Sequence, residues 1–407
     1  MSRSSSNASA LFAVPDYRRL WFIGAGLGVA RWLEFLALGV FAYQVTGSPP
    51  LVALVAIVRM LPNVFLGLVV GALADHLDRR RMLATGFLLG AVAYGVMAGV
   101  AFAGAAGYGT VILAATASGL MWTLDMPVRR RLLVDAAGIQ RMTAALGFDN
   151  STNYATRAIG PIAGGAAYQA FGIEGIFALS AAIYSFCFAL CTRLKTADPP
   201  EAHEKEEARI SLPSLLVPPR ELLWSRRFQV VLGVTVVFNV WCFPIISMVP
   251  VLGEKEFALS PVLIGMLSAS EGLGGTVGAV MIGLMAGQRP PSFQLYYFGV
   301  FTFVVLLLVM SAWLTLGVAV ICLLLIGAAA AAFSATQYAL VYTMSPPKLR
   351  GRAAGFMSIV IGTSTIGFYN TGFLFSRFDS ANALMLMGLQ GLVPIVILGV
   401  LWLRAKS

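Results

Sequence analysis

Charged side chains lie inside several long apolar stretches of this sequence, where an ionisable group is costly and is a functional candidate by default. Arg31 and Glu34 stand three positions apart in the stretch 20–44, a spacing that places both on one helix face. Arg59 lies in the next stretch, 50–74, at a similar depth if the two helices are antiparallel. The Glu34 carboxylate can therefore form a fixed structural ion pair with either arginine, or exchange protons as its partner changes. The sequence leaves both hypotheses open.

A second acid, Glu271, lies well inside the apolar stretch 260–287 and is flanked by glycines. No cation is close to it along the chain. We therefore expect Glu271 to be protonated or to bind a cationic group. It is the second candidate, after Glu34, for a residue that carries a coupling proton.

Polar and aromatic side chains in other apolar stretches are candidates for the lining of a substrate cavity, because ligand pockets combine apolar walls with few polar groups. Arg157 suits an anionic or catecholate-like group, but pairing with Asp149 or Asp125 is an equal alternative. The other candidates are Asp125, Asn150, Asn153, Asn239, Trp241, Gln337, Tyr338, Tyr342 and Asn370. Each of these can instead make a hydrogen bond between helices.

The composition requires a membrane. Of the 407 residues 58% are hydrophobic and 11% are charged, against about 25% charged in ordinary soluble domains. A membrane-spanning helix needs about 20 mostly apolar residues. Runs of this kind predict an all-α integral membrane protein with twelve transmembrane helices at 20–44, 50–74, 82–103, 108–127, 143–170, 173–193, 227–252, 260–287, 293–314, 316–344, 352–375 and 381–403.

A polar stretch at 194–226 divides these helices into two groups of six. We therefore predict an N-terminal six-helix bundle at 1–193, a cytoplasmic linker, and a C-terminal six-helix bundle at 227–407. The two bundles are expected to be pseudo-symmetric, because Pro127–Arg131 after the fourth helix is echoed by Pro346–Arg352 after the tenth. Two such repeats with a site near the midplane are typical of secondary transporters.

The net charge of +10 is explained by the expected orientation of the chain in the membrane. With both termini in the cytoplasm, most of the 28 Lys and Arg residues fall in cytoplasmic loops, tails or the linker, as expected for a multi-pass protein. The charge therefore predicts contact with anionic lipid and not with nucleic acid. The two histidines, His76 and His203, stand apart from any nucleophile or second ligand. We expect no metal or other cofactor, and no enzyme activity.

The loop Gly71–Arg81 resembles the signature loop between the second and third helices of the major facilitator superfamily. The positions that match the pattern are Gly71, Leu73, Asp75, Arg79 and Arg80. His76 replaces the usual Arg, and Asp78 replaces the usual Gly. The resemblance implies a conformational-switch loop, in which Asp75 faces the N-terminus of the eleventh helix and Arg79 and Arg80 hold it in place.

Shorter strings resemble the enterobactin-exporter-like branch of that superfamily. They are Tyr17–Trp21, Thr46–Pro49, Arg59–Asn63, Gly160-Pro161 with Gly164-Gly165, and Leu349–Arg352. The branch consists of bacterial inner-membrane exporters of siderophores, drugs and related amphiphiles, generally driven by proton exchange. The resemblance implies a monomeric exporter of a small amphiphilic molecule that works by alternating access and proton antiport. A lipid or lysolipid translocator, an importer, and more remotely a membrane enzyme or sensor are the alternatives.

Two positions depart from the antiporter pattern. Many proton antiporters have an Arg four residues before the position of Gly119, where this chain has Ala115. Thr156 stands where a Gly would precede Gly160-Pro161. These two motif positions therefore do not support proton antiport. The hypothesis of proton antiport rests instead on the charged residues inside the apolar stretches, namely Arg31, Glu34, Arg59 and Glu271. The sequence does not determine the substrate, the direction of transport or the coupling ion.

Overall fold

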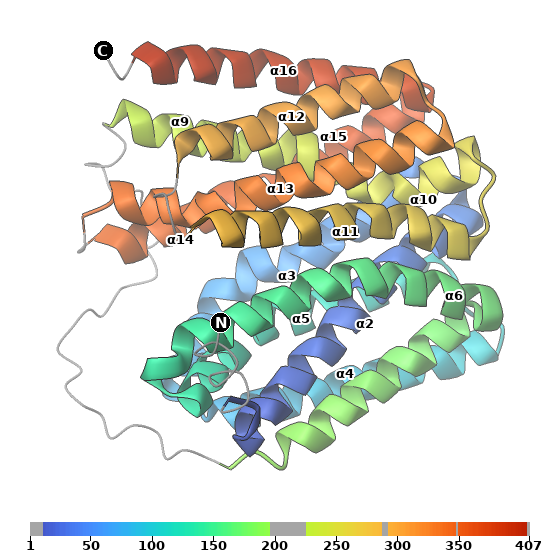
Figure 1. The fold of residues 1–407 in the computed structure, drawn as a ribbon. Coiled ribbons are helices and arrows are strands. Elements are labelled where there is room, and N and C mark those ends of the chain that lie inside the picture. The colour runs from blue at the N-terminus through green and yellow to red at the C-terminus, as the bar shows by residue number, and fades with distance from the viewer. Residues whose placement is uncertain (1–10, 196–224, 287–291, 347–348, 405–407) are drawn as a thin grey trace. The chain divides into compact units, whose positions relative to one another are not determined.

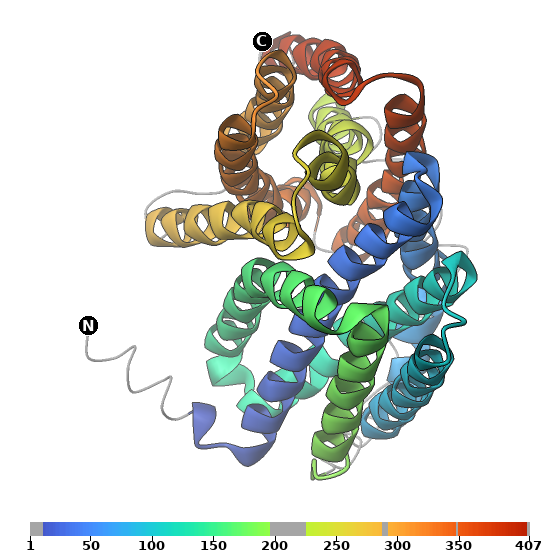
Figure 2. The same cartoon turned by 90° about the vertical axis from the view of Figure 1, so that its right-hand side faces the viewer.

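The structure, a computed structural model, describes residues 11–195, 225–286, 292–346 and 349–404. A few positions within these ranges, including Gly71 and Asp75, are described only by their secondary structure. Most of the predicted linker 194–226 is also outside it. Every regular element of the described ranges is a helix (Figure 1, Figure 2).

The described chain divides into two compact units. The first contains residues 11–45 and 58–195, and the second contains residues 46–57 and 225–404. The helix α3 begins in the second unit and continues in the first.

The first unit contains the long helices at the start of the chain. They are α2 (Pro15–Thr46), α3 (Pro49–His76), α4 (Arg79–Phe102), α5 (Tyr108–Ala137) and α6 (Met142–Cys191), with the short 3₁₀ helix η1 (Ile139–Arg141) before α6. The 50-residue α6 folds back on itself (Figure 1). The reversal is at Gly172, whose φ of 65° and ψ of −166° are accessible essentially only to glycine. Two membrane crossings, the fifth and the sixth, therefore lie within α6.

The second unit begins with a helix of changing pitch between Arg226 and Glu256. It consists of α9 (Arg226–Val237), a π-helical turn η2 (Phe238–Cys242), a 3₁₀ segment η3 (Phe243–Met248), α10 (Val249–Val251) and a second π turn η4 (Leu252–Glu256). Pro244 and Pro250 explain the irregularity, because each removes a backbone donor from the helical hydrogen-bond ladder. Such changes of pitch are frequent at functional sites.

The remaining helices of the second unit are α11 (Pro261–Ala286), α12 (Phe293–Ala312), α13 (Leu316–Met344), α14 (Arg350–Ile361), α15 (Ser364–Arg377) and α16 (Ser380–Arg404). In this unit α13 packs against both α11 and α12, and α12 also packs against α16. The predicted helix 352–375 is interrupted around Gly362 and Thr363, where α14 ends and α15 begins.

The described helices account for the predicted membrane crossings. Ten segments are long and apolar enough to cross a membrane, and the one within α6 holds two crossings. α14 and α15, of 12 and 14 residues, are each too short alone and together form the crossing that completes the set of twelve. The prediction of an all-helical membrane fold with twelve helices is therefore confirmed.

Candidate functional site

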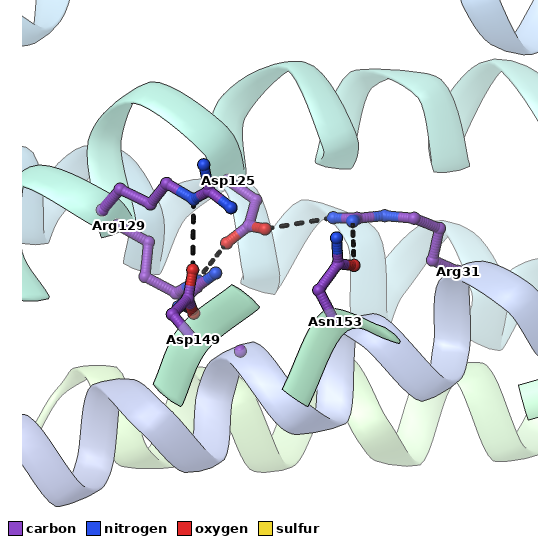
Figure 3. Close-up of a pocket in the computed structure, with 7 residues that line it drawn as sticks. Arg31, Asp125, Arg129, Asp149 and Asn153 are labelled. Carbon is purple, nitrogen blue, oxygen red and sulfur yellow. Dashed lines mark hydrogen bonds and ion pairs between the residues drawn. The ribbon is translucent and has the colours of Figure 1, made fainter. Parts of the chain in front are cut away.

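A buried chain of ion pairs lies in the first unit, between α5 and α6 (Figure 3). Asp125 and Arg129 stand one turn apart on α5, and Arg129 Nε donates to Asp125 Oδ1 at 2.5 Å. Arg129 Nη1 donates to Asp149 Oδ1 on α6 at 2.7 Å. All three side chains are buried. The guanidinium of Arg129 therefore joins two carboxylates on two helices.

The chain continues at both ends to further arginines. Arg31 on α2 donates from Nη2 to Asp125 Oδ2 at 3.1 Å. At the other end, Arg130 donates from Nε to Asp149 Oδ2 at 3.1 Å. We call the five residues Arg31, Asp125, Arg129, Asp149 and Arg130 the Arg–Asp ladder. Its charges alternate along the chain of contacts, and three helices contribute to it.

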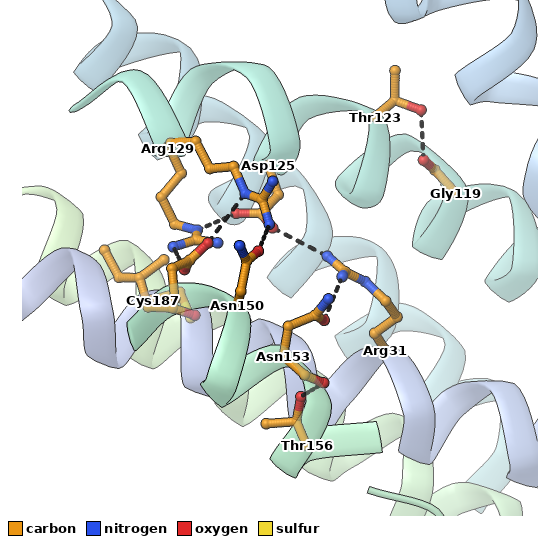
Figure 4. Close-up of polar contacts among 12 residues, drawn as sticks. Arg31, Gly119, Thr123, Asp125, Arg129, Asn150, Asn153, Thr156 and Cys187 are labelled. Atoms are coloured by element: carbon orange, nitrogen blue, oxygen red, sulfur yellow. Dashed lines mark hydrogen bonds and ion pairs between the residues drawn. The ribbon is translucent and has the colours of Figure 1, made fainter. Parts of the chain in front are cut away.

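Each end of the ladder also contacts an amide oxygen on α6 (Figure 4). Arg130 Nη2 donates to Asn150 Oδ1 at 2.8 Å. Arg31 Nη1 reaches Asn153 Oδ1 at 3.5 Å, which is long for a hydrogen bond. The ladder, Gly24 and Asn153 line a small polar cleft in this unit, with room for about one water molecule. The structure thus brings together the predicted residues Arg31, Asp125, Asn150 and Asn153.

Glu34, one turn beyond Arg31 on α2, is buried in a separate cluster of side chains. Its side chain has 0% exposure, and neither carboxylate oxygen has a hydrogen-bond partner among the described residues. Around it lie Arg59 and the hydroxyl groups of Tyr94, Tyr184, Ser118 and Ser180, none in hydrogen-bonding geometry with it. We call this group the Glu34 chamber. A buried acid without direct partners requires a proton, a bridging water or a charge partner.

Arg59 is the cation of this chamber. Its Nη2 donates to the backbone oxygen of Arg31 at 2.5 Å, while Nε and Nη1 are buried without a partner among the described residues. The indole ring of Trp122 is near both arginines, with its centroid 4.9 Å from Arg31 Cζ and 6.0 Å from Arg59 Cζ. Arg31 therefore pairs with Asp125 and not with Glu34, and of the two arginines considered from the sequence only Arg59 remains beside Glu34.

The other ionisable candidates lie elsewhere. Arg157 on α6 stacks on the indole ring of Trp32, with Cζ 4.8 Å from the ring centroid. Asp125 and Asp149, its possible partners from the sequence, are bound by the ladder arginines. Glu271 is buried on α11, where its backbone packs so closely against α13 that a Cβ on Gly327 would lie 1.9 Å from the Glu271 carbonyl oxygen.

Two of the candidates in the second unit share a hydrogen-bond acceptor. Gln390 Oε1 on α16 accepts from Trp241 Nε1 at 3.1 Å and from Asn370 Nδ2 at 2.9 Å. Trp241 belongs to the π turn η2 and Asn370 to α15. These three residues form a polar patch beside the irregular helix. Gln390 is not among the candidates from the sequence, although an amide inside an apolar stretch is the signal that would have found it.

The remaining candidates of this unit do not join that patch. Asn239 Nδ2 donates to the Thr235 carbonyl one turn earlier at 2.9 Å, and Gln337 Nε2 approaches the sulfur of Met357 at 3.8 Å. Tyr338 and Tyr342 are exposed on α13, with ring centroids 6.4 Å apart. Asn239 therefore makes a local contact within its own helix.

The signature loop is held by backbone contacts and by exposed ion pairs, among them Arg79–Asp135 and Arg81–Asp78. Arg79 donates to the Ala74 carbonyl at 3.0 Å and to Asp135 Oδ2 at 3.1 Å, and Arg80 donates to the Thr192 carbonyl. Asp78 accepts from the backbone N–H of Arg81 and caps α4. The predicted contact of Asp75 concerns a side chain outside the described part. Gly71 belongs to α3 like Asp75.

Comparison with known proteins gives the family. The chain matches the Major Facilitator Superfamily over residues 20–369. It belongs to this superfamily. No curated protein sequence gives a significant match to the chain. The superfamily is one of transporters, which agrees with a fold that buries ion pairs between membrane-spanning helices.

Solved structures of transporters share the fold. The nucleoside transporter NupG has a TM-score of 0.71 at 12% identity, with 95% of this chain and 99% of that chain covered. A bacterial homologue of the iron transporter ferroportin has a TM-score of 0.65 at 16% identity, covering 98% and 99%. An auto-inhibited peptide transporter of the POT family has a TM-score of 0.70 at 12% identity, covering 95% and 97%. At these identities the likeness concerns the fold.

Proposed function

We propose that this transporter exports a small amphiphilic molecule, such as a siderophore, a drug or a related metabolite, in exchange for protons. In this proposal the chain is a monomer in a bacterial inner membrane with both termini in the cytoplasm. The bundles 1–193 and 227–407 rock about the linker, and the loop around Asp75 changes its contacts as they do so. The resemblance of the short sequence strings to the enterobactin-exporter-like branch supports the direction of transport.

The observation that carries the proton coupling is the Glu34 chamber. An ionised carboxylate in such a place is costly unless a cation or hydrogen bonds compensate it. Arg59 supplies the cation, and its unpartnered Nε and Nη1 can bond to the carboxylate through water. Protonation of Glu34 removes one negative charge beside Arg59. Two states that differ in this way respond differently to a proton gradient, as coupled transport requires.

The polar patch formed by Trp241, Asn370 and Gln390 is proposed to contact the substrate. Indole and amide groups beside apolar walls suit a molecule with both aromatic and hydrogen-bonding groups. The patch adjoins the irregular helix 226–256, and discontinuous helices form substrate sites in many secondary transporters. We therefore place one part of the substrate contact there.

The test begins with purified full-length protein and a panel of siderophores, drugs and lysolipids. A ligand of the folded state raises the temperature of thermal unfolding by mass action. The best ligand is then loaded outside proteoliposomes that carry an imposed pH gradient. We expect accumulation in liposomes with an acidic lumen, and a matching alkalinisation of the lumen. Transport that is unaffected by the gradient in either direction would rule out proton exchange.

A further inference from the structure

The Arg–Asp ladder has one more positive charge than negative charges. Each of its carboxylates binds two arginines, one to each oxygen. Among the described residues, the two terminal arginines, Arg31 and Arg130, each bind only one carboxylate of the ladder. The excess cation therefore belongs to the ends and not to the middle.

The two ends are not equivalent. The Arg130 side chain is 33% exposed and has a short hydrogen bond to Asn150, so water can share its charge. The Arg31 side chain is 9% exposed, and its second contact is the 3.5 Å approach to Asn153. A desolvated cation gains most from an anionic partner, and here its remaining acceptor is distant and neutral. The Arg31 end therefore carries the less compensated charge.

The surroundings of Arg31 favour an oxygen anion. Arg31 and Asn153 both border the polar cleft. The Trp122 ring packs on the Arg31 guanidinium, with its centroid 4.9 Å from Cζ, and supplies no anionic partner. A guanidinium offers paired donors whose geometry matches a carboxylate. Arg31 can thus keep Nη2 on Asp125 while Nη1 turns from Asn153 to a ligand.

We propose that the Arg31 end of the ladder binds a carboxylate group of the transported molecule. The site deepens the proposed transport function, since it assigns that molecule an anionic group and places that group in the first unit. Asn153 is displaced from Arg31 Nη1 and its side-chain amide is then free to donate to the bound group. The ladder holds Arg31 in place from the opposite side.

The experiment compares two probes of nearly the same shape, of which only one carries a charge. Isothermal titration calorimetry of the detergent-solubilised full chain measures the affinity for 2-naphthoate and for 2-naphthamide. A charge-assisted hydrogen bond to a partly desolvated guanidinium predicts at least about tenfold tighter binding of the naphthoate. Binding needs no proton gradient, so this result is independent of whether transport is coupled to protons.

Two variants at Asn153 separate charge from shape. Asn153→Asp places a carboxylate of the chain itself beside Arg31, and we expect it to abolish the preference for naphthoate. Asn153→Ala removes the amide without adding charge, and we expect the preference to remain. The matched control is Asn150→Asp at the Arg130 end, which adds the same charge and should leave the preference within about twofold.

The outcomes decide the proposal. Thermal unfolding of each variant confirms that it is folded before titration, and Asn153→Asp should be at least as stable as wild type because it neutralises the excess cation. Equal binding of the two probes by wild type would overturn the proposal. So would equal effects of Asn153→Asp and Asn150→Asp. Naphthoate preference together with transport that ignores the pH gradient would keep this site and reject the proposed proton coupling.

Discussion

The guanidinium of Arg129 occupies the space that a side chain on Gly24 would need. A Cβ built on Gly24 would lie 2.5 Å from Arg129 Nη1 and 2.8 Å from Arg129 Cζ. The end of an arginine side chain normally moves aside, but this one is held by ion pairs to Asp125 and Asp149. The absence of a side chain at position 24 of α2 is therefore part of the ladder.

Gly24→Ala should destabilise the protein although it adds only one methyl group. Arg129 must shift and lengthen its contacts with two buried carboxylates, and overpacking of this kind costs about 1–3 kcal/mol. The measurement is the midpoint of thermal unfolding in detergent. Gly26→Ala is the matched control on the same helix, since its Cβ would meet only Cys187 and Ile183 at 3.5 Å. If Gly26→Ala lowered the midpoint of thermal unfolding as much as Gly24→Ala, the disturbed ladder would not be the cause of the destabilisation.

Asp125 and Asp135 allow a comparison of a buried and an exposed ion pair on one helix. Asp125→Asn leaves Arg31 and Arg129 with less compensation, and removing one partner of a buried ion pair costs about 3–5 kcal/mol. The Asp135 side chain is 48% exposed and pairs with Arg79. Asp135→Asn breaks this exposed pair and should lower the free energy of unfolding by at most about 1 kcal/mol. Expression yield and unfolding midpoint measure both. Similar losses in the two variants would contradict the burial argument.

Hydropathy predicted most of the helices, because each needs about 20 mostly apolar residues to cross the membrane. The helix at 143–170 has several polar residues in its first half and was predicted from the helix count and the topology. The position at which α5 ends was harder to predict from the sequence. The apolar run ends near Pro127, and the sequence therefore predicts that the basic residues 129–131 lie in a loop. The helix continues through Pro127 to Ala137, which places Arg129 among buried carboxylates. A proline within a membrane helix is tolerated, so the proline was a weak boundary signal.

The pairing of the charges could not be read from the sequence. Asp125 and Arg129 are four positions apart, and that spacing was a usable signal for a local pair. The partner of Arg31 is 94 positions away, and whether it is Asp125 or Glu34 depends on how α2, α5 and α6 pack. The same holds for Asp149, which could pair with Arg157 by sequence but contacts Arg129 and Arg130. The sequence alone shows which charged residues lie inside apolar stretches. Which of them form ion pairs with one another depends on how the helices pack, and that cannot be predicted from local composition.

The orientation in the membrane can be tested with single cysteines. The four native cysteines are buried, so labelling by an impermeant maleimide should have a low background. Cysteines at Gly104 and Ala258, both exposed between helices, should react in intact cells. Leu77 is exposed between α3 and α4, and a cysteine at this position should react only after the cells have been permeabilised. Reaction of the Leu77 variant in intact cells would reverse the proposed topology.

Glu34→Gln is the sharpest test of the coupling site. The amide has nearly the shape of the protonated acid and cannot ionise, so the variant is fixed in one of the two proposed states. We expect it to fold and to bind the transported molecule. It should lose accumulation driven by a pH gradient in proteoliposomes, because a proton shifts an equilibrium only through a group that binds it differently in the two states. Exchange without a gradient should continue.

The control is Glu271→Gln, which removes the second carboxylate that the sequence offers as a proton-coupling candidate. Glu34 faces Arg59 in its chamber, and its protonation therefore changes the charge balance of a buried pair. We expect Glu271→Gln to retain more gradient-driven accumulation than Glu34→Gln, or to lose it only for some substrates. The reverse pattern, with Glu34→Gln accumulating like wild type and Glu271→Gln inactive, would place the proton on α11 and leave Glu34 and Arg59 as a structural pair.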